Sequence, residues 1–462
     1  MCTTHGYGRR SVQPTPVASP APNGRQLLRD RAVATYLLAA SAQTIATTMQ
    51  AATLGKQIYD ITDSELALGL LGLVEFLPAL LLLPLTGSSA DRFDRRKVAA
   101  IAFGVEVVTS VLYCLYAASG PTSALPIFFV AALFGTARAF AAPSFRALPP
   151  LIAPDRGLPR LIALYSGTWQ FGLIVGPAAS GFLYAAHPMV PYLVAAVFFT
   201  TASLIVSTLK LRRPQVRAPS TERPTLHHAL EGLRFIRGRP VLLGAIALDM
   251  FAVLFGGAVA LLPAIAEDRL GVGSVGYGWL RAAPGVGAVI VTALLTVRPV
   301  RRHVGRTLLV SVAVFGVATI VLGITGNFVL AFLALLVLAG ADSVSVFIRA
   351  TIVPLATPDR MRGRVMAVEN VFVGASNELG AFESGVAGTV LGVGPAVWVG
   401  GALTLGVVGV WSVAFPALRD IDRFEDVAAQ DDDAPRPGDA VVDSARASPP
   451  GSSDMRTPEE HR

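Results

Sequence analysis

The chain has 462 residues, of which 53% are hydrophobic and only 15% are charged, and its mean hydropathy is +0.58. Soluble domains carry roughly 25% charged residues, so this composition excludes an ordinary soluble enzyme. The net charge of +7 is spread over short segments between long apolar ones, which is not the basic stripe of a nucleic-acid-binding protein. We therefore expect a lipid bilayer, and no nucleic acid, as partner.

The two ends of the chain have compositions that cannot build a core. Residues 1–32 contain five arginines and several prolines, with no apolar run long enough for a secretory signal. Residues 417–462 are rich in Asp, Pro and Ser. We interpret 1–32 as a disordered cytoplasmic arm and 417–462 as a disordered acidic cytoplasmic tail.

Twelve apolar segments of about 20 residues, the length that crosses ~30 Å of hydrocarbon, lie between these ends. Their ranges are near 33–58, 65–86, 98–119, 124–146, 161–186, 191–211, 241–264, 275–297, 307–326, 328–350, 365–391 and 395–416. The sequence thus predicts an all-α membrane protein with two six-helix lobes, 33–211 and 241–416. In the linker 212–240, apolar residues at helical spacing predict an amphipathic helix; they are Leu226, Leu230, Leu233 and Ile236.

The distribution of cations predicts the orientation. If the amino terminus is cytoplasmic, the segments on that side of the membrane contain 33 of the 38 Lys and Arg residues. On the opposite side lie only Lys56 and Arg269. Because Lys and Arg close to a membrane resist translocation, we expect a multi-pass protein of the cell membrane with both termini in the cytoplasm.

The two halves share a short internal repeat. Residues 150–163 match residues 354–367 at seven positions with a constant offset of 204, including Pro-Asp-Arg at 154–156 and 358–360. Both copies lie in the predicted inner loop between the fourth and fifth segments of their half. A duplicated inner loop is expected of a transporter built from two parallel repeats.

The loop after the second segment carries a recognisable motif. It runs Gly87-Ser-Ser-Ala-Asp91-Arg92-Phe-Asp94-Arg95-Arg96-Lys97. This resembles the major facilitator signature, which has Gly, three residues, Asp, a basic residue, any residue, Gly and two basic residues. Asp94 replaces the second Gly, and this variant resembles the branch that contains macrolide-type drug exporters and the enterobactin exporter.

That resemblance implies the major facilitator fold and alternating access between its two lobes. The residues that it assigns to the conformational motif are Gly87, Asp91, Arg92, Arg95 and Arg96. It also implies that Asp91 faces the amino terminus of the eleventh helix near Arg364, where a negative charge is favourable.

The fifth segment contains Gly172, Gly176-Pro177 and Gly181 at the spacing of the antiporter motif, with Ala163 and Ser180 in place of two glycines. The resemblance favours export over uptake. Small residues at this spacing also allow two helices to pack closely, so a packing seam explains the pattern equally well.

Ionisable residues at mid-membrane depth are costly and commonly functional. The candidates for a proton-coupling or charge network are Glu75, Glu106, Arg138, Asp249, Asp342 and Arg349. Arg138 could pair with Glu75 or Glu106, either as a proton-responsive pair or as a static one. Asp249 has no obvious arginine at its depth, which makes it a candidate proton site.

Polar and aromatic residues within the segments suggest a substrate cavity. The candidates are Gln43, Thr47, Gln50, Trp169, Glu369, Asn370, Asn377 and Glu383. Those of the eleventh segment fall within an arc of about 140° of a helix.

Together these features predict a secondary active transporter that exports an amphipathic drug, antibiotic or siderophore-like product by proton antiport, acting as a monomer. An importer of the same fold remains open. A membrane enzyme or a metal site is disfavoured because the six histidines lie in loops or tails. The chain lacks a phosphate-binding loop, so we expect no ATPase, no cofactor and no metal.

Overall fold

The computed structural model describes residues 23–427 except 83–84, 87–88, 90–92 and 215–225. The described part is all-α. Its amino-terminal lobe contains α1 (Gly24–Arg29), α2 (Arg31–Thr62), α3 (Glu65–Leu81), α5 (Arg95–Ala118), α6 (Leu125–Arg146), α7 (Pro149–Ile152), α8 (Leu158–Ala186) and α9 (Val190–Thr208). The six long helices of this lobe correspond to the first six predicted segments.

The carboxyl-terminal lobe follows α10 (Leu226–Arg237). It contains α11 (Pro240–Phe255), η1 (Ala258–Leu261), α12 (Leu262–Ala264), η2 (Ile265–Arg269), α13 (Gly273–Val297), α14 (Val304–Ile324), α15 (Phe328–Leu355), α16 (Asp359–Leu391), α17 (Val393–Ala414) and α18 (Pro416–Arg419). The seventh predicted segment therefore breaks into short turns after Phe255. Eight helices or joined helices of the described part are long and apolar enough to cross a membrane.

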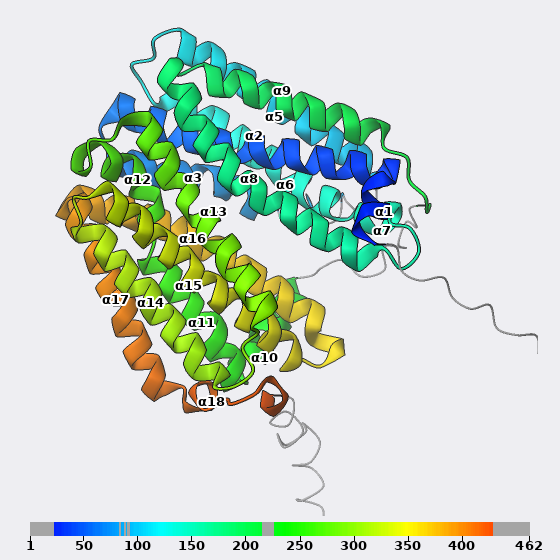
Figure 1. Ribbon diagram of the computed structural model, residues 1–462, viewed down its shortest axis with the longest axis vertical. Helices are drawn as coiled ribbons and strands as arrows, with labels where there is room; N and C mark the ends of the chain where they lie inside the picture. The colour runs from blue at the N-terminus through cyan, green and yellow to red at the C-terminus, as the bar shows by residue number, and fades with distance from the viewer. Residues whose placement is uncertain (1–22, 83–84, 87–88, 90–92, 215–225, 428–462) are drawn as a thin grey trace, which may run out of the picture.

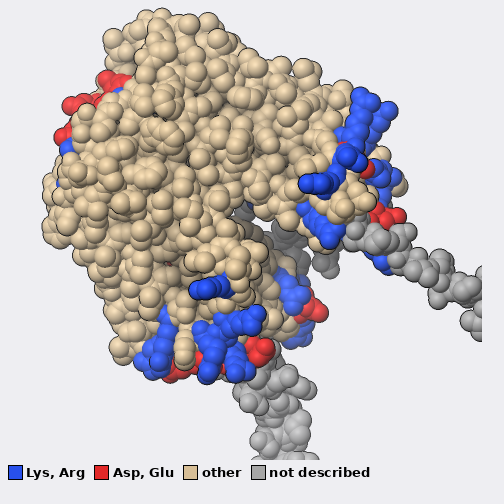
Figure 2. Space-filling view, in the orientation of Figure 1, with Lys and Arg blue, Asp and Glu red and all other residues tan. Residues whose placement is uncertain are grey.

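The two lobes form a V (Figure 1). We call the end where they meet the joined end and the end where they diverge the basic end. A large apolar cluster at the joined end includes Leu54 and Ile58 from one lobe and Leu261 and Leu280 from the other. The clusters nearer the basic end belong to one lobe each. Figure 2 shows Lys and Arg gathered at the basic end and a group of Asp and Glu at the joined end.

Glycines allow the lobes to approach closely at the joined end. A Cβ added to Gly181 of α8 would lie 2.9 Å from Cα of Gly278 on α13, and one added to Gly69 of α3 would lie 3.0 Å from Cα of Phe382 on α16. Real Cβ atoms rarely or never make contacts this short. These helix pairs therefore pack backbone to backbone across the lobe interface.

The predictions that residues 1–32 and 417–462 are disordered are wrong where these regions adjoin the two lobes, because the residues there are folded. Gly24–Arg29 form α1, which Asn23 precedes with a capping box, and Leu27 is fully buried. At the other end, Leu418, Ile421 and Val427 are buried in the core of the carboxyl-terminal lobe. In both cases a few apolar side chains anchor a segment whose average composition is polar.

The predicted amphipathic helix of the linker is present as α10. It packs against α16, where Gly232 lies against the backbone of Arg364, and Glu231 forms an ion pair with Arg364. Ile236 is buried in the carboxyl-terminal lobe. The linker is thus docked on that lobe through two of its predicted apolar positions, Leu233 and Ile236.

Candidate functional site

A pocket in the amino-terminal lobe joins residues from α2, α5, α6 and α8. It comprises roughly 490 Å³ of space, part of which is open to solvent, and is lined by Gln43, Thr47, Phe103, Glu106, Arg138, Ala141, Ala142, Phe145, Arg146, Tyr165 and Trp169. The predicted cavity residues Gln43, Thr47 and Trp169 therefore share one pocket with two members of the predicted charge network, Glu106 and Arg138. Aromatic walls with a few polar groups are typical of small-molecule sites.

Arg138 pairs with Glu75 and not with Glu106. Its Nη1 lies 3.1 Å from Oε2 of Glu75, and 45% of the arginine side chain is exposed. Glu106 is fully buried, and neither of its carboxyl oxygens has a hydrogen-bond partner among the described residues. A buried carboxyl group without a donor or a bound cation is far less costly in its neutral form.

Gln50 does not line this pocket, although the sequence predicted it as a cavity residue together with Gln43 and Thr47. It is fully buried, and its Oε1 accepts a hydrogen bond of 2.6 Å from the Ser110 hydroxyl of α5. Gln50 therefore ties α2 to α5 inside the lobe.

A second charge cluster lies in the carboxyl-terminal lobe around Arg349 of α15. Its Nη2 is 2.8 Å from Oδ1 of Asp249 on α11, and its Nη1 is 3.7 Å from Oε1 of Glu369 on α16. Only 6% of the arginine side chain is exposed. The expectation that Asp249 lacks an arginine is wrong, and Glu369 also belongs to this cluster, while its role in a substrate cavity stays a prediction.

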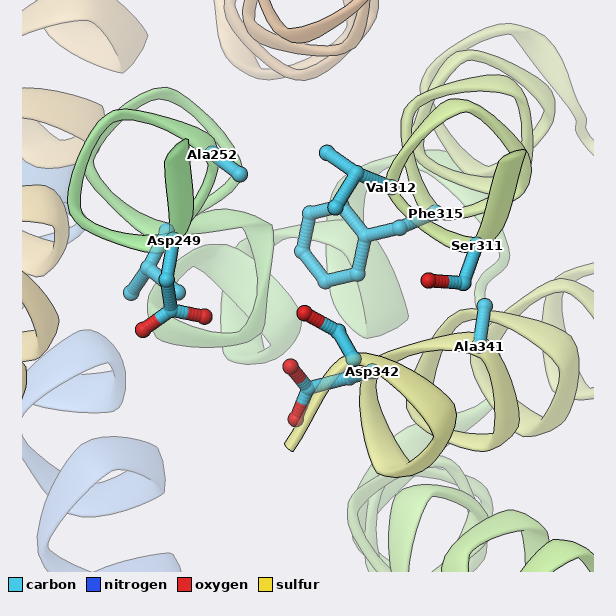
Figure 3. Close-up of a pocket in the computed structure, with 9 residues that line it drawn as sticks. Asp249, Ala252, Ser311, Val312, Phe315, Ala341 and Asp342 are labelled. Atoms are coloured by element: carbon cyan, nitrogen blue, oxygen red, sulfur yellow. The ribbon is translucent and has the colours of Figure 1, made fainter. Parts of the chain in front are cut away.

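Asp342 lies beside this cluster without a cation of its own. It lines a small space with Asp249, Ser311 and Ser345, and Figure 3 shows the carboxylates of Asp249 and Asp342 between α11 and α15. No described residue forms an ion pair or a hydrogen bond with the Asp342 side chain, and the buried Ser345 hydroxyl also lacks a partner. The cluster thus has three carboxylates for one guanidinium.

The other predicted cavity residues of α16 are not brought to either cluster. Asn370 and Asn377 are exposed, and the Asn377 amide donates to the carbonyl of Val373 on its own helix. Glu383 is half-buried, and its described hydrogen-bond partner is the adjacent Ser384. Their role in a substrate site remains a prediction.

The antiporter-like motif forms a packing seam in the structure. Gly172 and Gly176 of α8 lie against α2, where the Thr48 hydroxyl donates a 2.8 Å hydrogen bond to the Gly172 carbonyl. Pro177 lies within α8, and Gly181 meets Gly278 of the other lobe. The motif therefore lines both an intralobe contact and the interface between lobes.

Part of the loop motif can be located. Gly87, Asp91 and Arg92 lie outside the described residues. Asp94 caps α5 by accepting from the Arg96 amide at 3.0 Å, and the Arg96 side chain contacts both Asp94 and the Leu209 carbonyl at the end of α9. The Arg96 hydrogen bond holds the pKa of Asp94 below its usual value. An Asp at this position thus serves as a helix cap, which glycine cannot do with a side chain.

A polar network at the joined end was not predicted as a site. Lys56 of α2 forms ion pairs with Asp60 of its own helix and with Glu267 of η2 in the other lobe. Tyr59 donates to Asp268, and Tyr184 donates to Asp60 at 2.6 Å. The sequence identifies Lys56 only as one of two cations on the side opposite the cytoplasm, because its partner Glu267 lies 211 residues further along the chain. We call these six residues the joined-end network.

The comparison with known families decides the identity. The family model of the Major Facilitator Superfamily matches residues 32–381, which is most of the chain. The chain belongs to the Major Facilitator Superfamily. It is therefore a multi-pass membrane transporter of this family, as the loop motif implied.

Among characterised relatives, the chain is similar to the enterobactin exporter EntS of Escherichia coli O1:K1, with 27% identity over 283 residues. The alignment covers 60% of this chain and 66% of the relative, so slightly less than two thirds of that protein is matched. EntS of Shigella boydii serotype 18 is also 27% identical over 283 residues, with the same coverage.

Solved structures share the fold at low sequence identity. The nucleoside transporter NupG superposes with a TM-score of 0.62 at 13% identity, covering 85% of this chain and 100% of that one. A bacterial homologue of the human lysosomal transporter Spinster, in an inward-facing conformation, gives 0.64 at 15% identity, with 87% and 98% covered. These similarities establish the architecture of two six-helix lobes.

Proposed function

We propose that this transporter exports an amphipathic small molecule, such as a drug, an antibiotic or a siderophore-like product, in exchange for protons. Its basic end faces the cytoplasm, because juxtamembrane Lys and Arg resist translocation. The similarity to EntS supports the direction and the substrate class.

The V shape supports alternating access with the cytoplasmic side open. The lobes touch at the joined end through the Lys56 and Glu267 pair and through Tyr277, whose hydroxyl donates to the Ala52 carbonyl at 2.9 Å. A substrate that entered from the basic end would meet the amino-terminal pocket. Release to the outside then requires the lobes to rock, which separates the joined-end network and closes the basic end.

The pocket chemistry supports a substrate with an apolar, ring-containing body and a polar group. Trp169, Tyr165 and Phe103 supply aromatic surface, and Gln43 and the half-exposed Arg138 supply hydrogen-bond donors. Substrate and protons would use different lobes, since the carboxyl-terminal cluster encloses less space.

The observation that carries the proton assignment is the charge imbalance around Arg349. Asp249, Asp342 and Glu369 surround one guanidinium, and Asp342 has no ion pair within the described part of the chain. A proton on one of these carboxyl groups would offset the excess negative charge at low solvent access. Gain and loss of that proton would bias the two conformations.

The test is transport by the purified chain in proteoliposomes against lipophilic cations, macrolides and catechol-type siderophores. We expect accumulation of at least one compound on the side of the joined end, driven by an imposed proton gradient and abolished by an uncoupler. Gradient-driven accumulation on the opposite side would instead establish an importer. Transport that is unaffected by the uncoupler would refute the antiport mechanism.

A further inference from the structure

A second pocket lies at the basic end of the amino-terminal lobe, outside the sites described above. It is formed where α2 begins and α9 ends, and it encloses roughly 1150 Å³ of space that is open to the surroundings. Its lining residues are Asp30, Arg31, Ala32, Thr35, Ile205, Thr208, Leu209, Lys210, Leu211 and Arg212. Figure 2 shows Lys and Arg gathered at this end of the lobe, where α9 ends and α1 lies.

The pocket carries an excess of positive charge. Arg212 is paired with Asp30, whose carboxylate also caps α2 by accepting from the amides of Ala32 and Val33. Arg31 and Lys210 are exposed and form no ion pair with any residue of the described ranges. Two cations therefore face the pocket without a partner from the described chain, and a third lies beside them.

The corresponding place in the carboxyl-terminal lobe is filled. There α11 takes the position of α2, and α17 takes that of α9. Trp411 donates a 3.0 Å hydrogen bond to the Gly244 carbonyl of α11, and Phe415 and Leu418 pack against the same glycine. One lobe thus closes this groove with its own aromatic and apolar side chains, while the other leaves it open with basic walls.

The surroundings of the open groove are apolar toward the membrane. Leu38 of α2 and Leu204 of α9 lie one to two turns further along these helices, with 56% and 63% of their surfaces exposed. A ligand with an anionic head group and hydrocarbon chains fits this arrangement, in which a basic pocket lies beside exposed apolar side chains. Basic pockets between membrane helices on the cytoplasmic side are suited to phospholipid head groups.

We propose that this groove binds the phosphate head group of an anionic phospholipid of the cytoplasmic leaflet, through Arg31, Lys210 and Arg212. The lipid fills the groove between the first and last long helices of the amino-terminal lobe. Trp411 and Phe415 fill the corresponding groove of the other lobe. This inference rests on the orientation proposed above, which places the basic end in the cytoplasmic leaflet.

The test is lipid binding to the full purified chain, measured by native mass spectrometry during titration with phosphatidylglycerol or with phosphatidylcholine of the same acyl chains. We expect a clear preference for phosphatidylglycerol, reduced roughly 30-fold in Arg31→Gln/Lys210→Gln, since each cation near an anionic lipid contributes about a fivefold factor. The charge-preserving variant Arg31→Lys/Lys210→Arg should retain the preference.

Arg298→Gln/Arg301→Gln is the matched control, because it removes two exposed cations from the basic end of the other lobe. It should leave the preference unchanged. Equal losses in both double variants would attribute binding to overall charge and overturn the site. Displacement of the lipid by millimolar inorganic phosphate would assign a soluble anion and overturn the lipid. The measurement uses no gradient and no substrate, so its failure is distinguishable from failure of the transport proposal.

Discussion

The two lobes each contain an arginine within the membrane, but they surround it differently. Arg138 in the amino-terminal lobe is half-exposed at a pocket and touches one carboxylate, Glu75. Arg349 in the carboxyl-terminal lobe is buried and touches two, Asp249 and Glu369. Solvent at the half-exposed guanidinium of Arg138 screens its pair with Glu75 on one side, whereas the guanidinium of Arg349 is shielded from solvent together with both of its partners.

This difference suggests a division of labour within a pseudo-symmetric fold. The open pair leaves donors available to a substrate, and the closed cluster keeps its carboxylates away from bulk solvent. The same asymmetry recurs at the basic end, where one lobe has an open groove and the other a filled one. The two lobes therefore share the arrangement of their helices but not the chemistry between them.

The largest expected effect is a difference in the loss of stability when each of the two arginines is replaced. Arg349→Met should cost about 3–5 kcal/mol of stability, because it leaves two buried carboxylates without their cation. Arg138→Met, the matched control, should cost less, because the arginine that is lost is 45% exposed and only one carboxylate, Glu75, is left without its cation. Thermal unfolding of both variants in the same detergent measures this difference, and equal losses would contradict it. Adding Asp249→Asn to Arg349→Met should recover part of the loss.

The second prediction concerns coupling. Asp342→Asn should abolish gradient-driven transport but preserve substrate exchange and thermal stability, because Asp342 contributes no ion pair to the cluster. Asp249→Asn should instead lower stability, because it removes a direct partner of Arg349. Exchange and gradient-driven assays in proteoliposomes, run beside unfolding curves, distinguish the two. Normal coupling in Asp342→Asn would move the proton site elsewhere, with the unpartnered Glu106 as the next carboxyl group to test.

A smaller effect is expected in the amino-terminal pocket. Trp169→Ala should raise the KM for substrate roughly 10-fold, since it removes an aromatic wall. Phe171→Ala is the matched control, because it lies two residues further on α8, is 54% exposed and does not line the pocket. Concentration-dependent transport measures both, and similar KM values in the two variants would argue against this pocket as the substrate site.

Much of this architecture could be predicted from the sequence, because most of the long helices coincide with one apolar run each. The depth of the charged residues along these runs could also be read from the sequence, so Glu106, Arg138 and Asp342 could be named as charges at mid-membrane depth. The loop motif predicted the family that the comparison then established.

The partners of those charges could not be predicted, because they depend on how each helix is rotated and which helices are neighbours. Asp249 lies 100 positions before Arg349 in the chain, and no local pattern links them. Gln50 was predicted as a cavity residue, yet it is buried within the lobe and accepts a hydrogen bond from Ser110 of α5. The break of the seventh segment into short turns likewise brings Glu267 to Lys56, a contact between lobes that hydropathy does not encode.

The smallest effect concerns the segment after α18, which packs back against the start of α14. Asp422 accepts from the His303 amide at 3.0 Å and pairs with Arg302, and these donors lower its pKa. A group whose pKa is lower in the folded state stabilises it above the unfolded pKa and loses that effect as the pH falls through the folded one. Asp422→Asn should therefore accelerate hydrogen exchange of the Val304 and Gly305 amides, which bond to the same segment, at neutral pH. That difference from the unmodified chain should vanish below the lowered pKa of Asp422, where the carboxyl group is protonated and resembles the amide. A difference that persisted at every pH would show that the contact depends on shape and not on charge.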